Sequence, residues 1–154
     1  AVHSTVLGPA LGGMRLWPYH SVEEAKTDVL RLARGMTYKA ACAGLDLGGG
    51  KSVIIGKPED KTPALFEAMG EFVNSFGGTY ITAEDVNTKV EDMGHVAKKT
   101  KYVAGLAGKS GNPSPKTAWG CFIGLQATLQ EVFGAERAPF VRGQNLRALF
   151  QSVG

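Results

Sequence analysis

The sequence is poor in the residues that build disulfide frameworks and metal sites. It has two cysteines, Cys42 and Cys121, and three histidines that share no motif. No cysteine or histidine pair has the spacing of a zinc site, so we expect no bound metal. Both cysteines stand among apolar residues, which predicts buried thiols in a reducing, cytoplasmic compartment.

Long hydrophobic runs and dense positive charge are missing as well. No stretch approaches 18 consecutive apolar residues, which predicts no membrane span and no membrane partner. The net charge is +3, and the densest basic group is Lys98-Lys99-Lys101. That group ends a predicted helix, where cations favour the helix dipole. Because nucleic-acid binding usually requires a basic stripe, we expect no nucleic-acid partner.

Glycine, in contrast, is abundant. There are 21 glycines in 154 residues, about twice the ordinary usage. They cluster beside apolar residues, as in Gly12-Gly13 and Gly48-Gly49-Gly50, so they do not form a flexible linker. Together with a hydrophobic share of 44%, this composition predicts a globular domain.

Predicted helices and strands alternate along the chain. Ser21 and Glu24 form a capping box, and Thr62 caps a second helix that has Pro63 at its first position. Gly35 predicts a kink or break in the first helix. The alternation predicts an α/β domain with a mostly parallel sheet. The expected elements are an extended segment over 1–17, helices over 21–43, 62–76, 87–99 and 114–133, and strands over 52–55, 79–82, 101–104 and 146–150.

The segment Gly48-Gly49-Gly50-Lys51-Ser52 invites comparison with a phosphate-binding loop, but two features contradict it. The motif requires a glycine at position 45, with four residues between it and Gly50, but Leu45 stands there, and a strand follows where a helix is needed. What remains is a lysine at the mouth of a buried strand. A desolvated lysine has a lowered pKa and can act as a general base. Alternatively, the ammonium group of Lys51 reaches solvent, and spacing alone does not decide between the two.

Two further residues are candidates for binding a ligand. Lys39 lies in the apolar stretch 36–42, where it either reaches solvent or holds an anion such as a carboxylate. Asp85 follows a short predicted strand, and ligands of parallel sheets bind at the carboxyl ends of strands. Its alternative role is to cap the following helix, which spacing alone favours. Trp17, Tyr19 and Trp119 are interpreted as packing residues.

Five ordered blocks of the sequence resemble the substrate domain of the Glu/Leu/Phe/Val dehydrogenases, most closely the leucine branch. The resemblance covers nearly the whole chain. It implies a three-layer α/β/α domain with a mostly parallel sheet. The blocks are Leu7-Gly8-Pro9-Ala10-Leu11-Gly12-Gly13-Met14-Arg15, Arg34-Gly35-Met36-Thr37-Tyr38-Lys39, Leu47-Gly48-Gly49-Gly50-Lys51-Ser52, Ile81-Thr82-Ala83-Glu84-Asp85-Val86-Asn87-Thr88 and Ser110-Gly111-Asn112-Pro113-Ser114-Pro115.

This resemblance implies an NAD-dependent oxidative deamination of an L-amino acid to its 2-oxo acid and ammonia. Lys51 matches the catalytic lysine that activates water, and Asp85 matches the partner of the substrate amino group. Lys39 matches the residue that binds the substrate carboxylate. The remaining matches are Gly12, Gly13, Leu11 and Met36, which line the substrate pocket, and Thr117, which faces the cofactor.

The resemblance also bears on the substrate. The glutamate branch has a lysine at the position of Leu11, where it binds the side-chain carboxylate of its substrate. A leucine there leaves such a charge unpaired, which favours an apolar amino acid. Leucine is the expected substrate. Phenylalanine, valine or tryptophan is the alternative, and a catalytically inactive remnant that acts as a structural or small-ligand-binding module is another.

By the same resemblance, the chain is truncated at both ends. Residues 1–138 are expected to form the substrate-binding and catalytic domain, without the first strand and helix of the family. Residues 139–154 are expected to form a linker and the first strand of a Rossmann domain. The fragment alone is then expected to be inactive, because NAD is bound mainly by the missing C-terminal domain. The full-length enzyme is expected to be a homo-oligomer.

Overall fold

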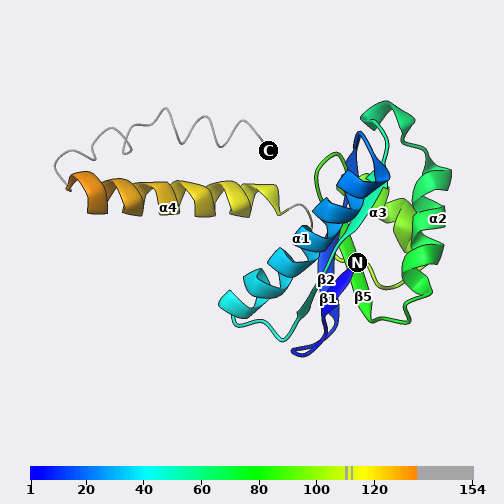
Figure 1. Ribbon diagram of the computed structural model, residues 1–154, viewed down its shortest axis with the longest axis horizontal. Coiled ribbons are helices and arrows are strands. Elements are labelled where there is room, and N and C mark those ends of the chain that lie inside the picture. The colour runs from blue at the N-terminus through cyan, green and yellow to red at the C-terminus, as the bar shows by residue number, and fades with distance from the viewer. Residues whose placement is uncertain (110, 112, 135–154) are drawn as a thin grey trace. The chain divides into compact units, whose positions relative to one another are not determined.

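The computed structural model of the protein describes residues 1–109, 111 and 113–134. The chain forms two compact units, Ala1–Gly111 and Asn112–Gly154. The first unit carries a five-stranded sheet and its helices (Figure 1). Its strands are β1 (Val2–Ser4), β2 (Ala10–Trp17), β3 (Gly48–Gly50), β4 (Ser52–Ile55) and β5 (Tyr80–Glu84), and its helices are α1 (Val22–Cys42), the short 3-10 helix η1 (Pro58–Asp60), α2 (Pro63–Asn74) and α3 (Val90–Ala97).

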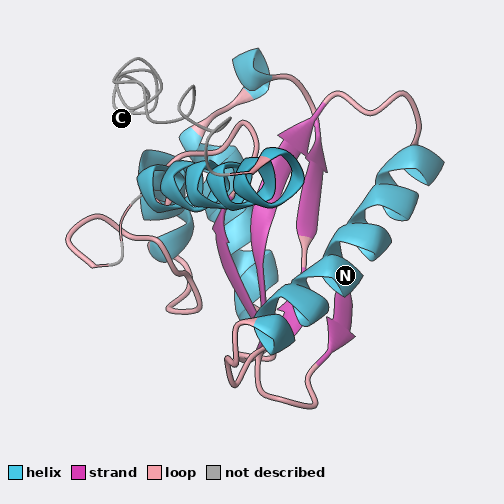
Figure 2. Ribbon diagram, turned by 90° about the vertical axis from the view of Figure 1, so that its left-hand side faces the viewer, coloured by secondary structure: helices cyan, strands magenta, loops and turns pink. Residues whose placement is uncertain are grey.

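Strand β2 is the centre of the sheet. It pairs in parallel with β3 and β4 on one edge and with β5 on the other. Because β3 and β4 keep the same register with β2, they are two halves of one strand, interrupted at Lys51 opposite Gly13. The antiparallel β1 completes the sheet beside β3. The sheet is therefore mostly parallel, as expected (Figure 2).

Helices cover both faces of this sheet, which gives the expected three layers. Helix α1 packs on one face, and α2 and α3 pack together on the other (Figure 1). The hydrophobic core lies on the α2 and α3 side, because alternate residues of β2 point to that face. Its buried members are Ala10, Met14, Phe66, Val73, Tyr80, Met93 and Val96.

The helix starts follow the predicted caps. The Ser21 hydroxyl accepts a hydrogen bond from the Glu24 amide at 3.1 Å, and the Thr62 hydroxyl accepts one from the Leu65 amide at 3.2 Å. Of the kink or break expected at Gly35, the break is wrong, since α1 runs through this position without interruption. An isolated glycine costs a helix only about 1 kcal/mol, which packing of α1 on the sheet outweighs.

The predicted helix over 87–99 is shorter in the structure, and the predicted strand over 101–104 is a single bridge. Helix α3 begins only at Val90, because the loop before it bonds to β2: the Asn87 side-chain amide donates to the Leu16 carbonyl at 3.0 Å. Val103 makes an isolated parallel bridge to Thr82. The basic group after α3 pairs with α2, where Lys98 contacts Glu67 and Lys99 contacts Glu71, each at 2.9 Å.

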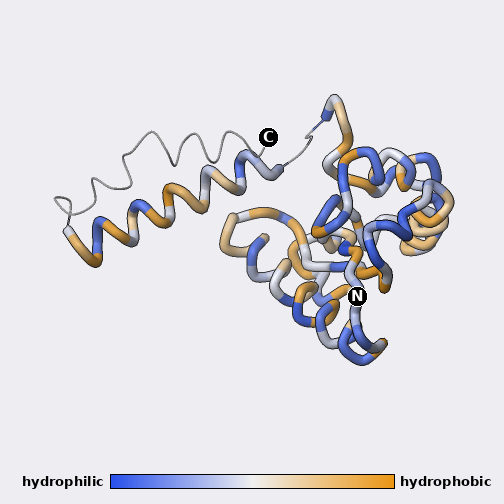
Figure 3. The backbone as a smooth tube through the Cα atoms, turned by 90° about the horizontal axis from the view of Figure 1, so that it is seen from above, coloured by the Kyte–Doolittle hydropathy of each residue, from blue (hydrophilic) through white to orange (hydrophobic). Residues whose placement is uncertain are grey.

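The second unit contains α4 (Ser114–Phe133), as predicted. Hydrophobic and hydrophilic residues alternate along this helix (Figure 3). The predicted linker and strand of residues 139–154 lie outside the described residues, so the division at residue 138 stays a prediction. Among the described residues, no helix is long and apolar enough to cross a membrane.

The prediction of buried cysteines is wrong. Cys42 and Cys121 are both exposed and free. Cys42 ends α1 at its exposed tip, where the neighbouring Ala41 and Ala43 are exposed as well. The apolar neighbours of a cysteine therefore did not indicate its burial. Trp17 is also exposed, at 44%, rather than packed in the core.

Candidate active site

Lys51 is a buried cation at the junction of β3 and β4. The residue is 5% exposed, and its Nζ lies 3.0 Å from Oδ1 of Asp85. Lys51 is one of the few buried charged or polar residues of the described chain. The alternative in which its ammonium group reaches solvent is thereby excluded. The strand that follows it, β4, also confirms that this is no phosphate loop, which would lead into a helix.

Gly13 makes the contact between Lys51 and Asp85 possible. It lies on β2 between the two strands that carry them, opposite Lys51 on one side and Ala83 on the other. A Cβ atom at position 13 would lie 2.5 Å from the Glu84 carbonyl oxygen and 2.7 Å from the Asp85 Cβ. The space of the missing side chain is therefore used by the segment that presents Asp85.

Asp85 does not cap a helix, so the alternative that spacing favoured is wrong. Helix α3 begins five residues later, at Val90, with Lys89 as its N-cap. Instead, the Asp85 amide donates to the Thr88 hydroxyl at 2.8 Å, and that hydroxyl donates to the Met14 carbonyl at 2.8 Å. These bonds tie the Asp85 backbone to β2 and leave both carboxylate oxygens for cations.

The second oxygen of Asp85 is held by an arginine. Oδ2 accepts a hydrogen bond from Nε of Arg15 at 2.9 Å, while Oδ1 faces Lys51. Burial alone would raise the pKa of Asp85, but the hydrogen bond from Arg15 and the charge of Lys51 outweigh it. The pKa of Asp85 is therefore lowered, and the side chain is a carboxylate at neutral pH.

Lys51 is shifted toward losing its proton. Burial is the largest influence on the pKa of Lys51 and lowers it, while the charge and hydrogen bond of Asp85 raise it. The charges of Arg15 and Lys39 lower it again. The balance leaves the pKa of Lys51 below the ordinary value of 10.5. A lysine in this condition is suited to accept a proton from a bound water or substrate.

Lys39 differs from Lys51 in its burial. It lies in the last turn of α1, is exposed, and has no ion pair within the described part of the chain. Its influence on the pKa of Lys51 places the two cations close enough to interact. Met36, one turn earlier on α1, and Leu11 on β2 are both half-buried. An unpaired ammonium group beside apolar side chains can bind a carboxylate.

The glycine pair of β2 serves the protein's own backbone. A Cβ at Gly12 would overlap the Gly50 carbonyl of the neighbouring strand, and one at Gly13 would overlap the Glu84 carbonyl. Both glycines are buried. Packing against neighbouring segments of the chain is therefore enough to require glycine at both positions, and the role of their backbone in lining a substrate pocket stays a prediction.

Thr117 belongs to the second unit. It lies in the first turn of α4, where its hydroxyl donates to the Pro113 carbonyl at 3.2 Å. Its lone pairs are left to accept a hydrogen bond. Among the described residues, no group of three or more histidine, cysteine or acidic side chains could hold a metal ion.

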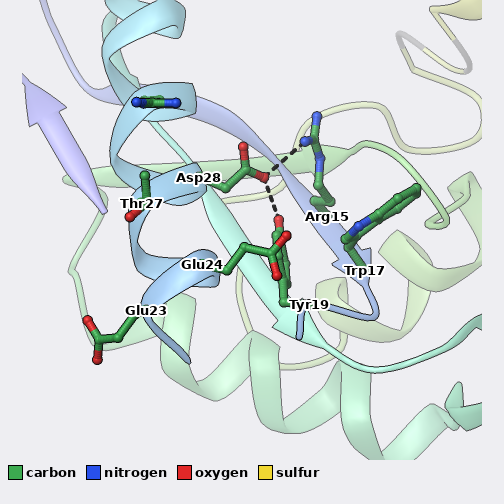
Figure 4. Close-up of a pocket in the computed structure, with 8 residues that line it drawn as sticks. Arg15, Trp17, Tyr19, Glu23, Glu24, Thr27 and Asp28 are labelled. Atoms are coloured by element: carbon green, nitrogen blue, oxygen red, sulfur yellow. Dashed lines mark hydrogen bonds and ion pairs between the residues drawn. The ribbon is translucent and has the colours of Figure 1, made fainter. Parts of the chain in front are cut away.

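Sequence reasoning missed Arg15, Asp28 and Tyr19. Arg15 bridges to Asp28 of α1 at 3.1 Å, and the Tyr19 hydroxyl donates to the same carboxylate at 2.5 Å (Figure 4). The one available signal was a charged residue in the otherwise apolar strand β2. These residues line a pocket of about 550 Å³ that also includes Trp17, Glu23, Glu24, Thr27 and Arg31.

Comparison with known proteins places this geometry in a family. Residues 1–102 match the model of the Glu/Leu/Phe/Val dehydrogenase, dimerisation domain. Leucine dehydrogenase of Geobacillus stearothermophilus is 57% identical over 140 residues, which cover 88% of this chain and 38% of that protein. Phenylalanine dehydrogenase of Lysinibacillus sphaericus is 51% identical, with 88% and 37% covered.

A solved structure agrees with these relatives. The crystal structure of L-tryptophan dehydrogenase from Nostoc punctiforme matches with a TM-score of 0.69 and 46% identity, over 88% of this chain and 38% of that one. The chain thus spans a little over a third of the length of the relatives it matches. With the family model matching well over half of its residues, the chain belongs to the Glu/Leu/Phe/Val dehydrogenase family.

Proposed function

We propose that this chain is the substrate-binding and catalytic part, over residues 1–138, of an NAD-dependent dehydrogenase that oxidatively deaminates an apolar L-amino acid, with leucine as the substrate. The observation that carries the proposal is the buried Lys51–Asp85 pair, with a Nζ to Oδ1 distance of 3.0 Å and a lowered pKa at Lys51. The relatives named leucine, phenylalanine and tryptophan dehydrogenase support the reaction class.

In this proposal Lys51 moves the protons. The substrate ammonium first releases one proton to bulk water. NAD would supply the acceptor for the hydride that then leaves the substrate Cα, and the substrate is left as an iminium ion. Neutral Lys51 takes a proton from water as the water oxygen bonds to that carbon. The proton then passes to the nitrogen, and ammonia departs as the new hydroxyl group loses its proton to Lys51, which leaves the 2-oxo acid.

Asp85 and Lys39 hold the two ends of the reacting group. The Asp85 carboxylate binds the substrate ammonium and stabilises the protonated form of Lys51 between the two proton transfers. The exposed, unpaired ammonium of Lys39 binds the substrate carboxylate. The carbon that reacts is thereby held next to Lys51, as a near-attack geometry requires.

Leu11 and Met36, with the backbone of Gly12 and Gly13, form the proposed contact surface for the substrate side chain. Both side chains are apolar and half-buried, so they favour an aliphatic group and leave a carboxylate unpaired. One methylene changes binding by only about 1–3 kcal/mol in an apolar pocket. Leucine is therefore expected to be the best of several apolar substrates rather than the only one.

In this proposal, one residue of the described chain, Thr117, contacts the cofactor. Thr117 has a hydroxyl with free lone pairs, which suits the carboxamide donor of a nicotinamide. The rest of NAD is expected to contact residues outside the described range. The proposal also includes a homo-oligomer, supported by the dimerisation domain that the family model names.

A substrate panel tests the proposal on the product of the complete gene that encodes this chain. NADH formation should be greatest with leucine, lower with isoleucine, valine and phenylalanine, and undetectable with glutamate. The 154-residue chain alone should give no turnover. No oxidation of any amino acid by the complete product would contradict the proposal and favour a non-catalytic binding module.

A further inference from the structure

Arg15 is a partly buried cation between two carboxylates on the α1 face of the sheet. Its Nε donates to Oδ2 of Asp85 at 2.9 Å, and its Nη1 contacts Oδ2 of Asp28 at 3.1 Å. The side chain is 22% exposed. The proposed reaction gives Arg15 no role, although Arg15 contacts Asp85, the residue that pairs with Lys51.

Asp28 and Tyr19 hold the outer end of Arg15. One carboxylate oxygen of Asp28, on α1, accepts from both the Arg15 guanidinium and the Tyr19 hydroxyl (Figure 4). Tyr19 is buried, and burial together with the hydrogen bond to Asp28 raises its pKa to about 12. Its hydroxyl therefore remains a donor across the working pH range.

We propose that Arg15 is a positioning residue for this site, and that Asp28 and Tyr19 hold Arg15 against Asp85 so that the other oxygen of Asp85 faces Lys51. The effect of this arrangement on turnover rests on the proposed function. The arrangement itself rests on four consecutive contacts, from Lys51 through Asp85, Arg15 and Asp28 to Tyr19.

The geometry of Asp85 explains why it needs a second cation. Each of its carboxylate oxygens has one cationic partner, Lys51 on Oδ1 and Arg15 on Oδ2. The terminal torsion of an aspartate is soft, so a single partner does not fix the plane of the carboxylate. Two partners on opposite oxygens do, and the planar guanidinium presents its donors in fixed directions.

The charge of Arg15 also acts on the proton of Lys51. The groups that influence Lys51 are Asp85, Arg15 of β2 and Lys39 of α1, and Asp85 also acts on the buried Tyr80 of β5. Arg15 lowers the pKa of both Lys51 and Asp85. Its presence thus lets Lys51 release a proton while Asp85 stays ionised.

The first test uses NMR titration of the 154-residue chain, following the Lys51 Nζ and the Asp85 carboxyl carbon. In Arg15→Met, both pKa values should rise, and in Arg15→Lys they should return part of the way. Arg31→Met is the matched control, because Arg31 lines the same pocket but has no ion pair within the described residues. It should leave both pKa values unchanged.

The second test uses variants that keep the shape of the site. Tyr19→Phe and Asp28→Asn should each speed the exchange of the Arg15 Nε–H with water several-fold, because the outer end of Arg15 is released. Unchanged exchange in both variants would overturn the roles of Asp28 and Tyr19. Unchanged pKa values in a folded Arg15→Met chain, or equal shifts in Arg31→Met, would overturn the role of Arg15.

Neither test requires substrate, so the two proposals fail separately. If the complete gene product oxidises no amino acid while the titrations shift as expected, the proposed function is wrong and the positioning role stands. If leucine is oxidised, Arg15→Met should move the pH profile of kcat/KM to higher pH. An unmoved profile would contradict the positioning role alone.

Discussion

Lys51 and Lys39 are the same residue type on two neighbouring elements, the sheet and helix α1, and they differ in burial and in ion pairing. Lys51 interrupts a buried strand, is 5% exposed and is paired with Asp85 at 3.0 Å. Lys39 lies in the last turn of α1, is exposed, and has no ion pair within the described chain.

This difference separates two kinds of chemistry. Burial lowers the pKa of Lys51, so the residue can exchange protons, while an exposed ammonium group is suited to attract an anion. The second lysine also supports the first, because the charge of Lys39 lowers the pKa of Lys51. In the proposed reaction, a substrate carboxylate bound to Lys39 would remove part of that influence, so substrate binding would raise the pKa of Lys51.

The largest effect is expected when the buried lysine, Lys51, is replaced. Lys51→Met should lower kcat of the complete gene product by about 10²–10⁴-fold, the usual contribution of a general base. KM should change far less. Lys57→Met is the control, since Lys57 is an exposed lysine just beyond β4. An equal loss in the control would mean that the buried environment of Lys51 has no special role.

Replacing the exposed lysine, Lys39, should have a smaller effect, and it should act on KM rather than on kcat. Lys39→Met should raise KM for leucine by about 10- to 100-fold, the value of a charge-assisted hydrogen bond, and should leave kcat nearly unchanged. The control is Arg34→Met, an exposed cation on the same helix. A fall in kcat as large as that of Lys51→Met would contradict the separate roles.

A third variant tests the close packing between α1, which carries Lys39, and β3, which ends just before Lys51. A Cβ at Gly49 of β3 would overlap the backbone of Thr37 and lie 2.5 Å from the Ala33 carbonyl, both on α1. Gly49→Ala should therefore lower the free energy of unfolding by about 1–3 kcal/mol, measured by urea denaturation.

Gly35→Ala is the matched control, because a Cβ at this position of α1 meets nothing within 4 Å. It should stabilise the chain by up to about 1 kcal/mol, since alanine favours the helix. Equal destabilisation by both variants would show that α1 does not depend on the close contact with β3.

The smallest effect is expected on the free energy of unfolding at acidic pH, to which Asp85 contributes. The pKa of Asp85 is lower in the folded chain than its ordinary value of 3.8, so the unfolded chain binds a proton first as the pH falls. The stability that Asp85 contributes is therefore present above pH 3.8 and is lost as the pH falls through its folded pKa. Urea unfolding at successively lower pH should show a shallower loss in Asp85→Asn than in the wild type or in Asp46→Asn, an exposed control.

Much of the fold follows from local signals in the sequence. The caps at Ser21 and Thr62, the strand after Lys51 and the alternation of helices and strands predicted the architecture, because each depends on neighbouring residues. Gly35 misled the prediction, since packing on the sheet outweighs its helix propensity. The strand predicted over 101–104 is only a bridge at Val103, because one residue pair of that segment forms a bridge with β5.

The site was predictable only in part. Lys51, Lys39 and Asp85 were identified through motifs, but motif spacing alone favoured a cap for Asp85. The decisive contacts join residues 34 and 70 positions apart along the chain, as between Lys51 and Asp85 and between Arg15 and Asp85. Asp28 and Tyr19 have no motif, and the contacts of Asp28 with Arg15 and Tyr19 exist only once α1 lies against β2.

The packing of Gly12 and Gly13 sets the evolutionary freedom of this site. Carbonyl groups fill the space of both side chains, so exchanging Asp85 for a smaller residue would still not admit a methyl group at position 13. Leu11 and Met36 have no such restriction and are half-buried. In the proposed pocket, new substrate ranges would therefore arise through changes at Leu11 and Met36, while packing keeps positions 12 and 13 as glycine.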